Sequence, residues 1–217
     1  MFSRQIPLIK KECQEKLGKS SIFVGGIGGL GSYVTDHLVR LGIGKLYICD
    51  YDRVDKSNIH RQILYNLKDV GKLKVEIAKE RLSDIGTACE IIEIKDKIKE
   101  GFNIPDVDVV VDCLDNAKSK IILSKISKRR NIYFVHGGVN GYFGQIMVIK
   151  DKSLDEIMEF GNNEGKEILP TIVSSVASLQ VNEILKILCS KENILLNKIM
   201  FVDMLNYDFS IVEVKSV

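Results

Sequence analysis

The sequence predicts an α/β protein: a Rossmann-like, mostly parallel sheet with helices on both faces, continued by antiparallel strands. Short apolar runs alternate with segments of helical periodicity over the first 135 residues, which is typical of parallel strands joined by crossover helices. From residue 142 onward the connections become too short for such helices. The 217 residues, of which 45% are hydrophobic, are enough for one domain spanning 1–217 with a well-buried core.

Five parallel strands are expected in the first part of the chain. Residues 20–24 form an apolar run that ends in glycines, and residues 107–111 are apolar throughout, as in a strand buried on both faces. Three further strand patterns lie at 45–49, 90–94 and 132–135. Apolar residues recur at helical spacing in 30–41, 75–82 and 116–128, which predicts helices between the strands.

The second part of the chain departs from this alternation. Residues 142–149 follow the preceding strand without room for a crossover helix, which predicts an antiparallel strand. Pro170 opens a helix expected over 170–188, and a final pair of strands is expected at 198–203 and 208–214. The polar segment 151–169 contains Gly-Asn-Asn-Glu-Gly and is predicted to be a mobile crossover loop, and 1–19 an N-terminal helix or arm.

Composition argues against several classes of function. The net charge is +2, with acidic and basic residues interspersed, so we expect no nucleic-acid or membrane partner. No run of consecutive apolar residues approaches the roughly 18 that cross a membrane, and residues 1–18 lack a signal-peptide core, so we expect a cytoplasmic protein. The five cysteines form no Cys-x-x-Cys pair, which predicts reduced thiols, no disulfide framework and no zinc site.

The first motif that carries chemistry is a glycine-rich turn between a predicted strand and a predicted helix. Gly26, Gly28 and Gly31 follow the Gly-x-Gly-x-x-Gly pattern, which lets the backbone approach a phosphate attracted by the helix N-terminus. Asp50 ends the second strand, where an acidic side chain accepts hydrogen bonds from a ribose. These features are typical of Rossmann nucleotide-binding proteins in general, and a turn needed only for packing is the alternative.

A polar segment at 50–62 favours a triphosphate over a dinucleotide. It contains Asn58 and Arg61, which can hydrogen-bond phosphate oxygens, the arginine through two N–H groups at once. Lys74, at the start of the next predicted helix, is placed to add a second cation. Because a single Arg61 or Lys74 is more often a plain surface charge, the segment is informative only as a whole.

The third motif is at the end of the most apolar strand and reads Asp112-Cys113-Leu114-Asp115-Asn116. Ligands of open parallel sheets bind beyond the carboxyl ends of the strands, and a carboxylate there can hold Mg²⁺. Asp115 has an alternative role as N-cap of the following helix, and for Asp112 a structural role is the better interpretation. For Cys113 and His136 we also favour structural roles, as a small buried residue and a hydrogen-bonded core histidine.

Taken together, the motifs resemble those of the ThiF/MoeB/HesA family, the bacterial relatives of ubiquitin-activating enzymes, and are closest in kind to ThiF. The matching segments follow family order from residue 4 to residue 186. They are Arg4-Gln5-Ile6, Gly26 to Ser32, Asp50-x-Asp52-x-Val54-x-x-Ser57-Asn58-Ile59-x-Arg61-Gln62, Gly71-x-x-Lys74, Asp112-x-x-Asp115-Asn116, Gly144-Gln145 and Leu179-Gln180-x-x-Glu183-x-x-Lys186.

The resemblance implies ATP and Mg²⁺ as cofactors and a role for each matching position. Arg61, Lys74 and Asp115 would act on the triphosphate, Asp115 through Mg²⁺ or on the α-phosphate. Arg4 resembles the family arginine that reaches into the neighbouring subunit's site, which implies a homodimer. The implied nucleotide-binding set is Gly26, Gly28, Gly29, Gly31, Asp50, Asp52, Ser57, Asn58, Arg61, Gln62, Lys74, Asp115 and Asn116.

The implied function is ATP-dependent adenylation of the C-terminal carboxylate of a ubiquitin-like sulfur carrier protein of the ThiS/MoaD type, in thiamine or related sulfur-transfer biosynthesis. Pyrophosphate is released, and the attacking carboxylate needs no general base because it is ionised at pH 7. Many relatives carry two Cys-x-x-Cys pairs for structural zinc, and some carry a loop cysteine. This sequence has neither, so we expect no zinc and no covalent relay through 151–169.

Three alternatives stay open on the sequence alone. One is adenylation of another carboxylate, on a modified tRNA base or a peptide, although the near-neutral charge argues against tRNA. Another is a catalytically silent nucleotide-binding half of a heterodimer, against which the complete set of ATP-contacting residues argues. The third is an NAD-binding Rossmann oxidoreductase, which the glycine turn by itself would permit.

Overall fold

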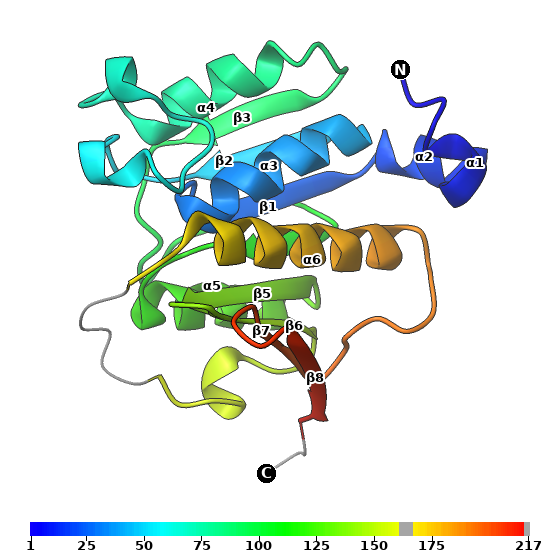
Figure 1. Ribbon diagram of the computed structural model, residues 1–217. Helices are drawn as coiled ribbons and strands as arrows, with labels where there is room; N and C mark the ends of the chain where they lie inside the picture. Colours follow the sequence, from blue (N-terminus) through cyan, green and yellow to red (C-terminus); the bar gives the residue numbers. More distant parts are fainter. Residues whose placement is uncertain (161–166, 215–217) are drawn as a thin grey trace.

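The computed structural model describes residues 1–160 and 167–214 and is built around one eight-stranded sheet. Its strand order is β3-β2-β1-β4-β5-β6-β7-β8 (Figure 1). The parallel strands are β1 Ser21–Gly25, β2 Lys45–Cys49, β3 Glu90–Ile94, β4 Val109–Asp112 and β5 Tyr133–Asn140, and the antiparallel ones β6 Phe143–Ile149, β7 Lys198–Asp203 and β8 Asp208–Glu213. The predicted fold class is confirmed.

Helices cover both faces of this sheet. One face carries α3 Gly29–Leu41, α4 Lys74–Ser83 and α6 Pro170–Leu188, and the other carries α5 Ala117–Arg129 (Figure 1). The short helices are α1 Ile6–Ile9, α2 Lys11–Leu17, η1 Lys56–Asn58, η2 Leu67–Asp69 and η3 Leu154–Glu156. Each face buries its own hydrophobic cluster, so the sheet is the shared wall between two cores.

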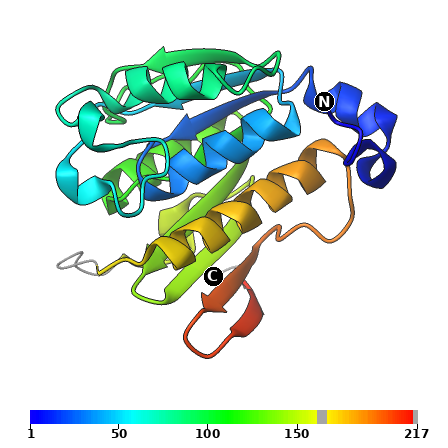
Figure 2. The same cartoon turned by 45° about the horizontal axis from the view of Figure 1, so that its top comes forward.

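The N-terminal helices lie at the far end of the sheet from the glycine turn. Figures 1 and 2 place α1 and α2 beside the entry to the parallel strands, whereas the turn between β1 and α3 lies at their exit. Gln5 fixes this position by donating from Nε2 to the Leu41 carbonyl at the end of α3, at 3.0 Å. Arg4, next in the chain, is exposed at this far end.

Helix α6 is long and apolar enough, by length and composition, to cross a membrane. Polar residues are scattered along the helix, so it contains no uninterrupted apolar run of that length. Half of the tested stretch is buried, and α6 packs against α3, β5 and β6. Because the core helix of a water-soluble domain passes the same test, this is weak evidence for a membrane span.

Two predicted segments differ from the structure by more than the one or two residues seen at the ends of other elements. β5 extends five residues beyond the expected 135, because Gly137 and Gly138 continue the strand beside β6. The predicted loop 151–169 contains η3, which buries Leu154, and Ile168 makes a parallel bridge with Gly141. Residues 161–166 lie outside the described residues, so the predicted mobility of that part stays a prediction.

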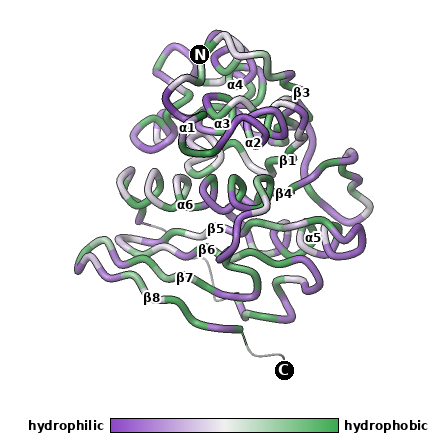
Figure 3. Tube along the Cα trace, turned by 90° about the vertical axis from the view of Figure 1, so that its right-hand side faces the viewer, coloured by the Kyte–Doolittle hydropathy of each residue, from purple (hydrophilic) through white to green (hydrophobic). Residues whose placement is uncertain are grey.

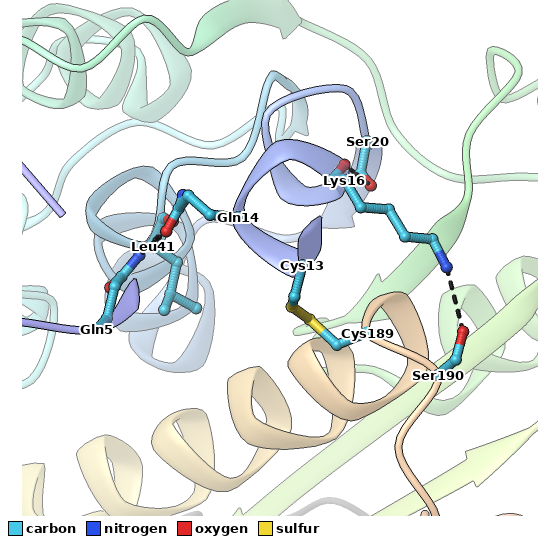
Figure 4. Close-up of a disulfide and its surroundings, with 8 residues drawn as sticks. All are labelled: Gln5, Cys13, Gln14, Lys16, Ser20, Leu41, Cys189 and Ser190. Carbon is cyan, nitrogen blue, oxygen red and sulfur yellow. Dashed lines mark hydrogen bonds between the residues drawn. A yellow bond between two sulfur atoms is a disulfide. The ribbon is translucent and has the colours of Figure 1, made fainter. Parts of the chain in front are cut away.

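The expectation of reduced, unpaired cysteines is wrong for one pair. Cys13 in α2 and Cys189 at the end of α6 form a disulfide, with 5.3 Å between their Cα atoms (Figure 4). The two residues are 176 positions apart and meet only because α2 packs on the end of α6. Spacing patterns cannot reveal such a pair.

The cytoplasmic location stays a prediction.

Hydrophobic residues concentrate on the inner strands and extend to the edge of the sheet (Figure 3). The edge strand β8 is exposed along its whole length, and Phe209, Ile211 and Val212 each keep about half of their surface in solvent at 53%, 54% and 52%. In the described part of the chain, the edge strand β8 therefore lacks the helical cover that α3, α5 and α6 give to the centre of the sheet.

Candidate active site

The chain builds the sheet from β1 outward to β3 and then returns to add β4 on the other side of β1. At this switch point between β1 and β4, a cleft of about 310 Å³ opens beyond the carboxyl ends of the strands. Ligands of open α/β sheets bind at such a switch point. The cleft is lined by most of the residues that the sequence analysis singled out. These are Gly26, Gly28, Gly29, Asp50, Asp52, Asn58, Arg61, Gln62, Lys74, Asp115 and Asn116.

Three of the expected residues do not line the cleft. Gly31 lies one turn into α3, and Ser57 is exposed, with its backbone N–H and hydroxyl bound to Asp55 Oδ1 at 2.8 and 2.6 Å. Arg4 lies at the opposite end of the sheet. Gly31 and Ser57 therefore contribute through the shape of the turn and of the segment, rather than as walls of the cleft.

The glycine turn requires glycine at two positions for steric reasons. Gly26 has a φ of +88°, and a Cβ there would approach the Cys113 carbonyl oxygen to 2.7 Å. A Cβ on Gly31 would overlap the Gly26 carbonyl oxygen, so α3 could not start this close to β1. The close approach brings the N-terminus of α3 to the cleft, where its N–H groups can attract an anion.

Asp50 extends from the end of β2 toward this turn and is 9% exposed. Its carboxylate accepts from the backbone N–H groups of Ile27 at 2.7 Å and of Asp52 at 2.8 Å. Burial raises the pKa of Asp50, and the charge of Lys74 and the two N–H groups oppose that rise. Asp50 thus ties the glycine turn to β2 at the position where a nucleotide ribose is expected.

The cations of the cleft come from the segment that follows β2. Asp55 caps η1, and Arg61 donates from Nη1 to the Ser57 carbonyl at 2.9 Å, which folds the segment back on itself. Lys74 begins α4 and is 6% exposed, and its Nζ lies 3.1 Å from Asp52 Oδ2. Asn58, Arg61 and Lys74 all reach the same cleft, as the sequence predicted.

Gln62 lies on the same wall and is 3% exposed. Its Oε1 is one of two buried side-chain oxygen or nitrogen atoms without a hydrogen-bond partner among residues 1–160 and 167–214. A buried acceptor left without a donor costs free energy, so Gln62 Oε1 is available to a donor that enters the cleft, from water or from a ligand.

Asp115 follows β4, lines the cleft and is exposed. The suggestion that it caps α5 is wrong, because Asn116 is the N-cap and its Oδ1 accepts from Ser119 N at 2.9 Å. Cys113 is 7% exposed, and burial raises the pKa of its thiol, which stays protonated and poorly nucleophilic. Both findings favour Asp115 over Cys113 as the functional group of this motif.

Lys120, a buried cation that lines the cleft, was not among the predicted site residues. Its Nζ lies 2.9 Å from Asp112 Oδ2 and donates to the Gly137 carbonyl at 2.9 Å. Helical spacing could have found it, because Lys120, Leu123, Ser124 and Ser127 are all buried on one side of α5. A lysine on a buried helix face needs a partner, and Asp112, which ends the buried strand just before α5, was a candidate for it.

Asp112 also binds His136, which completes a buried network. His136 Nδ1 lies 2.7 Å from Asp112 Oδ2, and Gln145 Nε2 lies 3.1 Å from His136 Nε2. Burial and Lys120 lower the pKa of His136, so it is neutral, donates to Asp112 and accepts from Gln145. Burial would raise the pKa of Asp112, but Lys120 and His136 outweigh it and lower that pKa. The structural roles favoured for Asp112 and His136 agree with these contacts.

A further wall of the cleft was also missed, at the end of β3. Asp96 and Ile98 line the cleft there, together with Tyr51 beside Asp50. Lys97 places its Nζ 5.1 Å from the centre of the Tyr51 ring. This wall gives the β2–β3 side of the cleft an aromatic surface next to the expected ribose position.

No group of three or more His, Cys, Asp or Glu side chains in a metal-binding arrangement occurs in the described part of the chain. A Mg²⁺ ion does not need such a group, because it is commonly held by one or two carboxylates together with substrate phosphates. Asp115, which is exposed and lines the cleft, is a donor of that kind. The absence of zinc stays a prediction.

The sheet, the turn and the polar walls define a nucleotide-binding protein of the Rossmann type. The chain belongs to the ThiF family, whose family model matches residues 2–216. It is 31% identical over 205 residues to the probable molybdopterin-synthase adenylyltransferase of Porphyra purpurea, covering 88% of this chain and 53% of that protein. It is 32% identical over 152 residues to the sulfur carrier protein adenylyltransferase of Thermus thermophilus, covering 69% and 56%.

The fold likeness extends to solved structures. E. coli MccB crystallised with ATP aligns with a TM-score of 0.84 and 21% identity, covering 96% of this chain and 67% of that one. At this identity the likeness concerns the fold. The chain spans little more than half the length of the two sequence relatives named above, 53% and 56%.

Proposed function

We propose that this protein is an ATP-dependent adenylyltransferase that activates the C-terminal carboxylate of a ubiquitin-like sulfur carrier protein. The observation that carries the proposal is the cleft at the switch point between β1 and β4, where the glycine turn, Asn58, Arg61, Lys74 and Asp115 come together. Membership of the ThiF family and the names of its relatives support it. A carrier of the ThiS or MoaD type in thiamine or related sulfur-transfer biosynthesis is the partner we propose.

The reaction needs binding and orientation rather than a protein nucleophile. The substrate carboxylate attacks the α-phosphorus of ATP, a new carboxyl–phosphate bond forms, and the bond to the β-phosphate breaks and releases pyrophosphate. Arg61 and Lys74 would hold the triphosphate and balance the negative charge that develops on it. Gly26 and Gly29 keep the backbone of the turn close to the phosphates.

Asp115 is the residue that would hold Mg²⁺, and when bound the ion would neutralise phosphate charge. Asp115 follows the carboxyl end of β4 and lines the cleft there, whereas Lys74 reaches the cleft from the start of α4. That position suits a group that orients the α-phosphate between the nucleotide and the incoming carboxylate. We further propose a homodimer in which Arg4, remote from its own cleft, reaches the partner's cleft.

ATP–pyrophosphate exchange in the presence of a ThiS-type or MoaD-type carrier tests the proposal. We expect exchange with wild-type protein and a loss of about 10²–10³-fold in Arg61→Ala and in Asp115→Ala, as for other removed transition-state contacts. The matched controls are Lys118→Ala and Asp84→Ala, two exposed charges outside the cleft. Near-normal exchange in folded Asp115→Ala would remove the role assigned to that residue.

Thermal shifts with nucleotides and exchange with other substrates separate this function from the alternatives. A thermal shift with ATP and Mg²⁺ but not with NAD is expected of an adenylyltransferase, and the reverse of an oxidoreductase. If ATP binds but no carrier supports exchange, the protein is either a silent nucleotide-binding partner or acts on another carboxylate. Exchange with a peptide or a modified tRNA in place of a carrier would identify that other substrate.

A further inference from the structure

Helix α6 buries two polar side chains one turn apart, Gln180 and Glu183, which are 0% and 2% exposed. Both lie in the motif at 179–186 that resembles the ThiF family pattern. Glu183 holds the chain that follows the helix, because its carboxylate accepts from Leu195 N at 2.7 Å and lies 2.6 Å from Lys186 Nζ. Gln180 points to the sheet, so its partners are found in the strands.

The Gln180 amide bonds to the carboxyl ends of two neighbouring strands. Its Nε2 donates to the carbonyl of Asp112, the last residue of β4, at 3.0 Å and lies 3.4 Å from the Val135 carbonyl in β5. Its Oε1 lies 4.0 Å from Cys113 Sγ. Gly137 leaves the space for this amide, since a Cβ there would lie 2.5 Å from Gln180 Cδ. Gln180 therefore fills the α6 face of the sheet at the point where β4 ends.

Asp112, which Gln180 holds from the α6 face, is bonded from other directions as well. Its carboxylate lies 2.9 Å from Lys120 Nζ of α5 and 2.7 Å from His136 Nδ1. Because α5 and α6 cover opposite faces of the sheet, the last residue of β4 is bonded from both helices (Figure 1). Its Oδ1 accepts from Leu114 N at 3.0 Å, which shapes the turn after the strand. These contacts fix the direction in which the chain leaves β4.

Asp115 lies three residues beyond this anchored strand end. Between the two, Cys113 N donates to the Gly25 carbonyl at 2.9 Å, so the chain is still tied to β1 before it turns. The position of the Asp115 carboxylate therefore depends on where the Asp112 backbone is held. A displacement of about 1 Å in such a group can cost about 10²-fold in rate.

The polar nature of Gln180 is not explained by packing. The other buried residues on this side of α6 are mostly apolar, namely Ile172, Val173, Val176, Ala177, Val181, Ile184 and Leu188. An apolar residue would fill position 180 as well, and an amide is tolerated there only because it is hydrogen-bonded. The role of Gln180 thus lies in the bonds that it makes to the end of β4.

We propose that Gln180 is a positioning residue for adenylation, which sets the place of the Asp115 carboxylate by holding the backbone of Asp112. The inference rests on the proposed function and adds to it a residue that contacts no substrate, since Gln180 is fully buried and does not line the cleft. Arg61 and Lys74 come from the segment after β2, so nucleotide binding should not depend on Gln180.

Replacement of Gln180 by methionine tests the proposal, because methionine keeps the length of the side chain and removes its N–H donors. We expect the kcat of ATP–pyrophosphate exchange to fall about tenfold while the KM for ATP stays within about twofold. Gln180→Asn, which keeps a buried amide but withdraws it by one methylene, should lose kcat in the same way. Thermal unfolding shows whether each variant is folded at the assay temperature.

Two controls separate positioning from a general loosening of α6. Ile184→Val removes one buried methyl group from the same helix and leaves the bonds to β4 intact, so its kcat should be normal. Ser178→Ala changes an exposed side chain of α6 and should also be normal.

A double-mutant cycle with Asp115→Ala asks whether Gln180 acts through that carboxylate. If it does, Gln180→Met should lower kcat about tenfold in the wild-type background and less than about twofold in the Asp115→Ala background. A tenfold loss in both backgrounds overturns the inference, because the effect of Gln180 would then not pass through Asp115.

The outcomes keep this inference apart from the proposed function. Normal kcat in folded Gln180→Met and Gln180→Asn overturns the inference and leaves adenylation intact, and so does an equal loss in Ile184→Val. If wild-type protein exchanges no pyrophosphate with any carrier or other carboxylate, the proposed function fails, and the inference that rests on it fails too.

Discussion

Replacing Lys120 by methionine is expected to reduce the free energy of unfolding by about 4 kcal/mol at about pH 8. The side chains of Lys120 and Asp112 are 7% and 0% exposed, and their charged atoms are 2.9 Å apart. Removing one half of a buried ion pair typically costs about 3–5 kcal/mol, because the other charge stays buried without its partner. The Gly137 carbonyl also loses its donor, whereas methionine keeps the length and the apolar stem of lysine.

The loss should become smaller as the pH falls, because His136 can replace Lys120 as the counter-charge. In the wild type, the pKa of His136 lies below its unfolded value of about 6.5. The unfolded state therefore takes up this proton first, and the wild type loses stability as the pH drops below about 6.5. Without the Lys120 charge the pKa of His136 rises, so the variant loses less stability over the same range.

Urea unfolding followed by circular dichroism, at about pH 8 and about pH 5.5, measures both effects. Lys118→Met is the matched control, since Lys118 is an exposed lysine on the same helix and should change stability by less than about 0.5 kcal/mol. A Lys120→Met variant that loses under about 1 kcal/mol at the higher pH would refute the ion-pair argument. An equal loss at both pH values would refute the part assigned to His136.

Three further predictions follow from other contacts. Gly31→Ala should lose the thermal shift with ATP and about 1–3 kcal/mol of stability, because its Cβ overlaps the Gly26 carbonyl; a normal ATP shift would contradict this. Cys13→Ser should lose up to about 5 kcal/mol, since its bond to Cys189 spans 176 residues; a reductant should match that loss in wild type and leave the variant unchanged. If Arg4 acts across a dimer, mixing inactive Arg4→Ala and Asp115→Ala proteins should restore roughly a quarter of wild-type exchange, and no recovery would count against it.

Local patterns predicted most of the sheet and its helices. β2, β3 and α6 begin and end at the predicted residues, because each is an apolar or periodic run bounded by residues that interrupt it. The cleft followed from topology, since the carboxyl ends of adjacent parallel strands must lie at one edge. For this reason Asp50, Lys74 and Asp115 could be assigned to one site although they are far apart in sequence.

What the sequence could not provide were contacts between elements that no local pattern links. The disulfide joins Cys13 to Cys189 across the packing of α2 on α6, and neither cysteine has a neighbour that indicates the other. The part of β5 that runs past the end of β4 depends on a difference in length between the two strands, and the prediction ended β5 five residues early. Such features arise from packing and register, which the chain determines only as a whole.

The two buried lysines of the cleft have different partners, and this difference separates their roles. Lys120 is paired with Asp112, a fully buried carboxylate. Displacing Lys120 would leave the Asp112 charge buried without a partner, which costs about 3–5 kcal/mol. Lys74 is paired with Asp52, whose side chain is 43% exposed and can be solvated by water once the lysine moves. A triphosphate can therefore compete with Asp52 for Lys74, provided that Lys74 stays near the buried Asp50 whose charge it also balances, whereas Lys120 stays in place. Lys74 is suited to bind the substrate, and Lys120 to neutralise the buried charge of Asp112 at the end of β4.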